Sequence, residues 1–315
     1  MTLSNTDITV IAKVLLGGII VILNSLILVV FKRGKLSDVV HVILSHQALS
    51  DIIIGLTNMI RILYFWYASD PGFWCRFLVS PTLLSIGMAS SIILMLSVQF
   101  YMSVSHASLI NPAGHSKKGK VILICVWLFW IAYSFAPLAF DMHVNPNGSK
   151  QCFLVGGYVF QVYFAVFGGL NVLLWVLILY FSSRTIINLR QSMQNQKTTS
   201  NSTSDSKRKK RQLDRFIQTV KTVGVIALIF SLCIMPFNIS LIITGIYPSN
   251  RLAGKMMVYF SLTIPVNSFS NIFVYAHRNI QFRTMLLNVL RRRPVENNVA
   301  EVSNITGYLI CYAIQ

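Results

Sequence analysis

Seven long apolar stretches, separated by short polar segments, dominate the chain. A helix of about 20 apolar residues crosses the hydrocarbon core of a bilayer. Strands of a membrane barrel would instead show alternating segments of about 10 residues. The stretches cover residues 14–31, 39–67, 77–105, 121–140, 153–183, 222–247 and 256–276. The pattern predicts an all-α membrane protein, a bundle of seven transmembrane helices.

A shorter amphipathic segment follows the seventh stretch, at residues 279–290. Its apolar residues Phe282, Leu286 and Leu290 recur at helical spacing around Arg283. This pattern is typical of a helix lying on a membrane surface. We therefore expect a short eighth helix.

The composition excludes two other classes of protein. Charged residues make up 11% of the chain, hydrophobic residues 54%, and the mean hydropathy is +0.63. A soluble globular protein carries about 25% charged residues, and a disordered chain needs low hydrophobicity. The composition matches neither a soluble globular protein nor a disordered one, which leaves a protein with several membrane spans.

The basic residues predict the orientation in the membrane. The net charge is +18, and 21 of the 27 Lys and Arg residues lie in the odd-numbered connections and after the last span. Basic connections stay in the cytoplasm, so we expect a multi-pass plasma-membrane protein with its N-terminus outside and its C-terminus inside. The basic run 207–211 adjoins a span, which favours contact with anionic lipid over nucleic-acid binding.

These patterns together divide the chain into four parts. Residues 1–11 form an extracellular N-terminus, and 12–278 a seven-transmembrane domain with a cytoplasmic loop at 184–218. Residues 279–290 form the amphipathic helix and 291–315 a cytoplasmic tail. The first stretch has basic residues after it, unlike a signal peptide, so we expect it to remain as a span.

Asp51 lies in the middle of the second span, where an ionised carboxylate costs about 2.5–3.5 kcal/mol. It must therefore face the bundle interior and find polar partners there. The candidates are Asn24 in the first span and Asn267, Ser268 and Asn271 in the seventh. Such oxygen-rich surroundings could hold a sodium ion, or they could only join the helices by hydrogen bonds. The two interpretations are compatible, and no other cofactor is indicated.

Two cysteines and a glycosylation sequon fall on the predicted extracellular side. Cys75 and Cys152 can form a disulfide in that oxidising compartment, or they can remain free thiols. The sequence Asn147-Gly148-Ser149 is an acceptor for an N-linked glycan.

Prolines interrupt several spans. Pro236 falls inside the sixth, Pro137 near the end of the fourth, Pro265 in the seventh and Pro81 near the start of the third. Each removes a backbone hydrogen bond and favours a kink. A kinked sixth helix with a long basic extension could act as a lever, or the kink could be static and filled by packing.

Taken together, these residues resemble the rhodopsin-like (class A) G-protein-coupled receptors over residues 12–290. The residues that match the family's motifs follow one another in the same order as in the family. They are Asn24, the segment 48–51, Cys75 with Cys152, Trp127 with Pro137, Tyr180, the segment 233–236, the segment 267–275 and Phe282. The resemblance implies a receptor fold, and it implies that Cys75 and Cys152 form the family's disulfide.

The chain departs from the family at the residues tied to coupling. Gln99-Phe100-Tyr101 stands at the Asp-Arg-Tyr site, and Ile234 stands where the hinge tryptophan is usual. The family's arginine contacts the G protein, and Phe100 cannot do so. The resemblance implies that the switch and coupling residues are Gln99, Phe100, Tyr101, Tyr180, Ile234, Pro236 and Tyr275.

The resemblance also implies a ligand pocket in the outer half of the bundle. The positions of this chain that match the family's pocket are Thr82, Leu83, Ile86, Phe164, Phe237, Asn238, Leu241 and Ser261. Amine-binding members have Asp where this chain has Thr82, and light-sensing members have Lys where it has Pro265, so amines and retinal are disfavoured. Arg61 could pair with an anionic ligand group, or it could reach the interface or pair with Asp70.

The sequence leaves three hypotheses for function. The first is a cell-surface receptor that binds a small molecule or short peptide and signals through heterotrimeric G proteins by movement of the sixth helix. The alternative is a seven-helix receptor without efficient G-protein activation, such as a scavenger, a partner subunit or an arrestin-coupled receptor. The third, a transporter, is disfavoured because no internal repeat is visible. No nucleophile–base pair or metal-ligand cluster indicates an enzyme.

Overall fold

The computed structural model describes residues 5–33, 39–67, 77–105, 112–144, 158–198, 204–247, 250–278 and 280–291. Within these ranges the chain is helical, and seven segments are long and apolar enough to cross a membrane. The predicted seven-helix bundle is thereby confirmed. The helices are α1 (Asn5–Arg33), α2 (Val39–Tyr67), α4 (Ser80–Ser105), α5 (Pro112–Val144), α6 (Tyr158–Thr198), α7 (Ser204–Ile246), α8 (Arg251–Ser261), α9 (Ile264–Arg278) and α10 (Ile280–Leu290).

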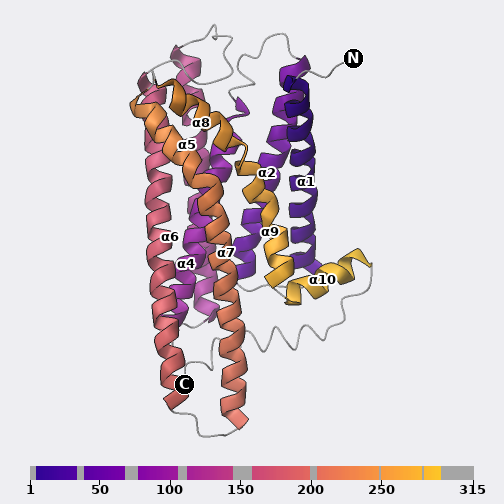
Figure 1. Ribbon diagram of the computed structural model, residues 1–315, viewed down its shortest axis with the longest axis vertical. Helices are drawn as coiled ribbons and strands as arrows, with labels where there is room; N and C mark the ends of the chain where they lie inside the picture. The colour runs from indigo at the N-terminus through magenta and orange to yellow at the C-terminus, as the bar shows by residue number, and fades with distance from the viewer. Residues whose placement is uncertain are drawn as a thin grey trace.

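The helices pass up and down through one bundle, as Figure 1 shows. We call the end at which α1 begins the upper end and the end at which α10 lies the lower end. With this choice α4 and α6 run downward, whereas α5 and α7 run upward. α10 lies across the lower end, and its Phe282 and Met285 are buried there while Leu290 is exposed.

Two predicted segments contain more helix than their polar composition suggested. α1 begins at Asn5, inside the segment 1–11 expected to precede the bundle. The sequence of the connection 184–218 predicts helical extensions of the fifth and sixth spans at 184–193 and 207–221, with a flexible linker at 194–206 between them. In the structure α6 continues to Thr198 and α7 begins at Ser204, so both helices also reach into the segment expected as the linker. Gln, Lys and Arg are good helix formers, and these residues prolong the spans below the rest of the bundle (Figure 1).

The seventh span is broken and not merely kinked. α8 ends at Ser261 and α9 begins at Ile264, with Thr263 N–H donating to the Phe260 carbonyl at 3.1 Å in the turn between them. Pro265 is the second residue of α9. Proline lacks a backbone N–H and suits the first turn of a helix, so the break lies just before it. Pro137 and Pro236, in contrast, lie inside α5 and α7.

Small residues let neighbouring helices approach closely, as they do in other membrane bundles. A Cβ atom on Gly17 of α1 would lie 2.9 Å from the Gly55 carbonyl of α2. A Cβ atom on Gly87 of α4 would lie 2.3 Å from the ring of Trp130 of α5. Glycine is thus required where α1 meets α2 and where α4 meets α5.

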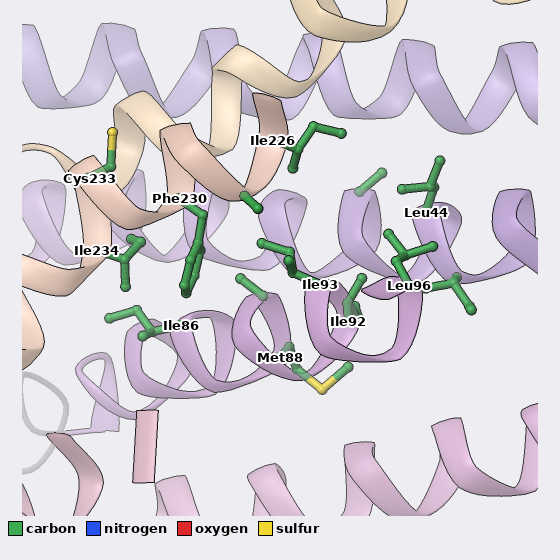
Figure 2. Close-up of a cluster of buried hydrophobic side chains, with 14 of the residues drawn as sticks. Leu44, Ile86, Met88, Ile92, Ile93, Leu96, Ile226, Phe230, Cys233 and Ile234 are labelled. Atoms are coloured by element: carbon green, nitrogen blue, oxygen red, sulfur yellow. The ribbon is translucent and has the colours of Figure 1, made fainter. Parts of the chain in front are cut away.

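The centre of the bundle is an apolar contact between α4 and α7. Figure 2 shows Phe230 and Ile234 of α7 pointing toward α4, where Ile86 and Ile93 lie. All four side chains are buried. Figure 2 also places Leu44 of α2 in this cluster, so the core joins the second, third and sixth of the spans.

Candidate functional site

Asp51 lies in the interior of the bundle, 1% exposed. Asn271 Nδ2 of α9 donates to its Oδ2 at 2.8 Å, and Gln47 Nε2 donates to both carboxylate oxygens at 3.3 and 3.4 Å. The Ser268 side chain is a further hydrogen-bonding partner. The carboxylate therefore joins α2 to α9 through Asn271 and Ser268, while Gln47 supports it from α2 itself, so the buried charge has the polar partners that membrane physics requires.

The other predicted partners lie around this centre but contact it less directly. Asn24 Nδ2 of α1 donates to the Ser268 carbonyl at 3.1 Å and to the Ile20 carbonyl at 3.0 Å, which ties α1 to α9. Asn267 is buried one turn above Asn271, and within the described ranges it makes no hydrogen bond to Asp51. Sequence reasoning missed Gln47, although its position four residues before Asp51 places both on one face of α2.

The residues around Asp51 fit a hard cation. Besides the carboxylate, Asn24 Oδ1 and Gln47 Oε1 are buried oxygens that accept no hydrogen bond from the described part of the chain. Carboxylate and amide oxygens are the ligands that such cations prefer. The sodium ion expected among Asp51, Asn24, Asn267, Ser268 and Asn271 stays a prediction, which a sodium-dependent gain in thermal stability, absent in Asp51→Asn, would support.

Near the upper end, the predicted pocket residues from α4 and α7 lie in the interior. Leu83, Ile86, Phe237, Asn238 and Leu241 are all buried. Phe164 of α6 packs against the same core, and Ser261 is half-buried at the end of α8. The structure thus gathers these side chains in the upper half of the bundle.

Three of the polar groups in this region have no hydrogen-bonding partner within the described ranges. They are the Thr82 hydroxyl, the Ser134 hydroxyl and both polar atoms of the Asn238 carboxamide. Ser134 and Asn238 are 0% exposed. A buried polar group left unpaired costs about 1–3 kcal/mol, so this arrangement is expensive for a purely structural core.

We call these three residues the polar layer (Thr82, Ser134 and Asn238), because their positions along α4, α5 and α7 place them at similar heights in the upper half of the bundle. Thr82 precedes Ile86 by one turn in the descending α4, and Asn238 follows Ile234 by one turn in the ascending α7, while Ile86 and Ile234 face each other (Figure 2).

Ser134 completes the layer from α5. It follows Trp130 by one turn in that ascending helix, and Trp130 lies against Gly87 of α4. Four residues rise about 6 Å along a helix, so each of the three residues lies about that far above its reference residue, which is Ile86 for Thr82, Ile234 for Asn238 and Trp130 for Ser134. Sequence reasoning missed Ser134, although its spacing from Trp130 could have indicated an inward-facing position.

The side chains of four predicted site residues are not among those that the structure describes. Cys75, Cys152 and Asn147 lie outside the described residues, and so does the side chain of Arg61. The disulfide between Cys75 and Cys152, the glycan on Asn147 and the role of Arg61 stay predictions.

At the lower end, the expected coupling residues are distributed over different faces. Phe100 is buried, 5% exposed, beside the partly buried Gln99 and Tyr101, and Tyr101 contacts Phe181 of α6 with ring centroids 5.5 Å apart. Tyr180 is 55% exposed and points away from the bundle. The structure therefore does not bring Tyr180 to the interior, where a switch residue would act.

The remaining switch candidates lie in the interior. Tyr275 of α9 is buried, with its ring centroid 5.7 Å from Phe282 of α10 and 6.4 Å from Phe31 of α1. Ile234 belongs to the central apolar contact, and Pro236 is partly buried two residues above it. The aromatic cluster at Tyr275 fastens α10 to the lower end of the bundle.

A series of hydrogen bonds joins α4 to α6 over much of their length. Ser90 Oγ donates to Asn171 Oδ1 at 2.5 Å, and the hydroxyls of Ser97 and Ser182 lie 3.3 Å apart. At the lower end Asn188 Nδ2 donates to Ser105 Oγ at 2.6 Å. Sequence reasoning missed this series, because a lone serine or asparagine in a span does not reveal its partner.

Comparison with known proteins agrees with this architecture. The sequence model of the family described as "7 transmembrane receptor (rhodopsin family)" matches residues 23–275. A protein named "QRFP-like peptide receptor" from Branchiostoma floridae is 24% identical over 293 residues, which cover 86% of this chain and 74% of the relative. The match to the family covers the bundle from α1 to α9, including Asp51 and the polar layer. The chain is therefore a multi-pass membrane protein that belongs to the rhodopsin family of seven-transmembrane receptors, a family of receptors and not of enzymes.

Proposed function

We propose that the protein binds an extracellular ligand at the upper end of the bundle and transmits binding to a cytoplasmic partner through displacement of α7. One contrast carries this proposal: side-chain hydrogen bonds join α4 to α6, whereas α7 meets α4 through apolar side chains. Hydrogen bonds are directional, but apolar contacts can slide and repack. A ligand with different contacts in two positions of α7 would shift the equilibrium between them.

The ligand is a short peptide or a small molecule. The name of the relative, a peptide receptor, supports a peptide. The buried upper-half residues of α4 and α7 support a ligand that enters between these helices, because ligand sites combine an apolar wall with a few polar groups. The N-terminus lies outside the cell in this proposal, which follows the distribution of basic residues.

The partner is a heterotrimeric G protein, an arrestin, or both. The lower ends of α6 and α7 extend furthest into the predicted cytoplasm (Figure 1), and their basic sequences suit an acidic partner surface. Phe100 favours a second candidate function, a receptor with little G-protein activation, because a buried phenyl ring cannot supply the cation that an arginine would.

Nucleotide exchange on purified G proteins tests both candidates. Membranes rich in the wild-type receptor are expected to raise the exchange rate above that of receptor-free membranes, and Phe100→Arg is expected to raise it several-fold further. Phe100→Leu, which keeps an apolar side chain, serves as the control and should match the wild type.

Arrestin recruitment measured on the same variants separates the remaining outcomes. A silent wild type that becomes active as Phe100→Arg would favour the second candidate. Absence of both exchange and arrestin recruitment, in every variant, would contradict the proposed transmission to a cytoplasmic partner.

A further inference from the structure

We infer that Trp175 of α6 and Ser231 of α7 form a latch that holds the lower half of α7 in its position against α6. Trp175 Nε1 donates to Ser231 Oγ at 2.7 Å, and Ser231 Oγ donates in turn to the Ala227 carbonyl at 2.7 Å. The inference rests on the proposed function in one respect, the displacement of α7. It adds the pair of residues that must separate before the lower half of α7 can leave α6.

The segment of α6 that carries Trp175 is fixed to α4. One turn above Trp175, Asn171 Oδ1 accepts a hydrogen bond from Ser90 of α4 at 2.5 Å. About two turns below it, the hydroxyls of Ser182 and of Ser97 on α4 lie 3.3 Å apart. Because α6 is tied to α4 on both sides of the indole, Trp175 is a donor in a fixed place. A displacement of the lower half of α7 must therefore break its bond to the indole.

The upper half of α7 is held against α6 in a different way, by close approach of the two backbones. A Cβ atom on Gly168 of α6 would lie 2.7 Å from the Asn238 carbonyl of α7. A Cβ atom on Gly245 of α7 would lie 2.6 Å from the Gln161 carbonyl of α6. Both contacts lie above Pro236, whereas the latch lies below it. The latch is therefore the contact with α6 that restrains the lower half.

The latch is harder to open than the other hydrogen bond that reaches this part of α7. Thr263 Oγ1 contacts the Cys233 carbonyl of α7 but also the Phe260 carbonyl of α8, so it keeps a partner if α7 moves. The indole N–H of Trp175 is a donor only, and Ser231 is its acceptor within the described ranges. The hydrocarbon core offers no water to replace that acceptor. Opening the latch leaves an unpaired donor, which opposes the displacement of α7.

A second tryptophan–serine pair provides a matched control away from α7. Trp130 Nε1 of α5 donates to Ser91 Oγ of α4 at 2.8 Å. The donor, the acceptor and the length match those of the latch, but this pair joins α4 to α5. Loss of either serine hydroxyl leaves an indole N–H unpaired. Ser91→Ala and Ser231→Ala therefore remove the same kind of bond, and only the second change releases α7.

A distance measurement on the full-length receptor in nanodiscs, without ligand, tests the latch. Spin labels are attached through Arg184→Cys on α6 and Lys221→Cys on α7, in a background with Cys125→Ser and Cys311→Ser. Arg184 and Lys221 are exposed and lie about 15 Å below the latch along their helices. Electron–electron resonance then gives the distribution of distances between the lower parts of α6 and α7.

Ser231→Ala should add a population with longer distances, and Trp175→Phe should add the same population. Ser231→Thr keeps the hydroxyl and should give the wild-type distribution, as should Ser91→Ala. The variants Trp175→Phe and Trp130→Phe repeat the comparison from the donor side. A wild-type distribution in both Ser231→Ala and Trp175→Phe, or the same lengthening in Ser91→Ala, would overturn the inference.

The distances do not depend on signalling. If they lengthen in Ser231→Ala while nucleotide exchange and arrestin recruitment are absent in every variant, the latch stands and the proposed transmission fails. If exchange is seen but Ser231→Ala and Trp175→Phe leave the distances unchanged, the receptor proposal stands and the latch fails.

Discussion

At the scale of single residues, the packing of α4 against α5 depends on a glycine that lies opposite a tryptophan ring. Gly87 of α4 lies against the ring of Trp130 of α5, whose Nε1 donates to Ser91 Oγ at 2.8 Å. Trp130 is 2% exposed and also contacts Phe167 of α6, with ring centroids 5.8 Å apart. The indole therefore connects three helices, and the absent side chain of Gly87 makes room for it.

Gly87→Ala should destabilise the receptor by about 1–3 kcal/mol, because overpacking forces either the ring or the helices apart. Thermal unfolding in detergent would measure the loss as a lower melting temperature. Gly169→Ala on α6 is the matched control, since no atom lies within 4 Å of a Cβ atom there. An equal effect of the two substitutions would contradict the packing role assigned to Gly87.

Tyr180 shows what residue type alone cannot reveal. Its position in the fifth span suggested a switch role, yet the side chain points away from the bundle and is 55% exposed. The inward face of α6 instead carries Phe167, Asn171 and Ile178. A membrane helix is apolar all round, so its sequence gives only a weak signal of which face is inward.

At the scale of elements, Thr263 links α7 to the break between α8 and α9. Its Oγ1 lies 2.5 Å from the Cys233 carbonyl of α7 and 2.7 Å from the Phe260 carbonyl of α8. A hydroxyl has one proton, so it donates to one carbonyl at a time. If α7 moves away, the hydroxyl keeps the bond to Phe260 and is not left unpaired, which lowers the cost of releasing α7.

Thr263→Val should weaken the attachment of α7 by about 1 kcal/mol, the net contribution of one such hydrogen bond. Hydrogen exchange of backbone amides around Pro236 should become faster in this variant, with a modest fall in melting temperature. Thr263→Ser keeps the hydroxyl and should behave as the wild type. If the valine and serine variants exchange alike, the hydroxyl does not hold α7.

At the scale of the whole molecule, the up-and-down bundle gives its two ends different chemistry. The upper end contains the polar layer, and below the lower end α6 and α7 extend beyond the other helices (Figure 1). Between the ends, Asp51 and the central apolar contact connect α2, α4, α7 and α9. Any signal that crosses the membrane must pass through this middle section.

The orientation of these ends can be measured directly. A tag before Met1 should react with an impermeant reagent on intact cells, whereas a tag after Gln315 should react only after permeabilisation. The basic connections dictate this result, because Lys and Arg near a span are retained in the cytoplasm. Labelling of both tags on intact cells would refute the orientation and, with it, the proposed sides for ligand and partner.

The sequence alone determined the number of spans, the family and the presence of a buried carboxylate. The length of an apolar run and the cost of a charge in hydrocarbon are local properties, so the seven spans and Asp51 could be read without knowing any neighbour. Only the tertiary structure decided which side chains meet. The break before Pro265, the series from Ser90 to Asn188 and the unpaired groups of the polar layer depend on how each helix is rotated against the others. That rotation is set by close contacts such as Gly87 with Trp130, which join residues far apart in the chain.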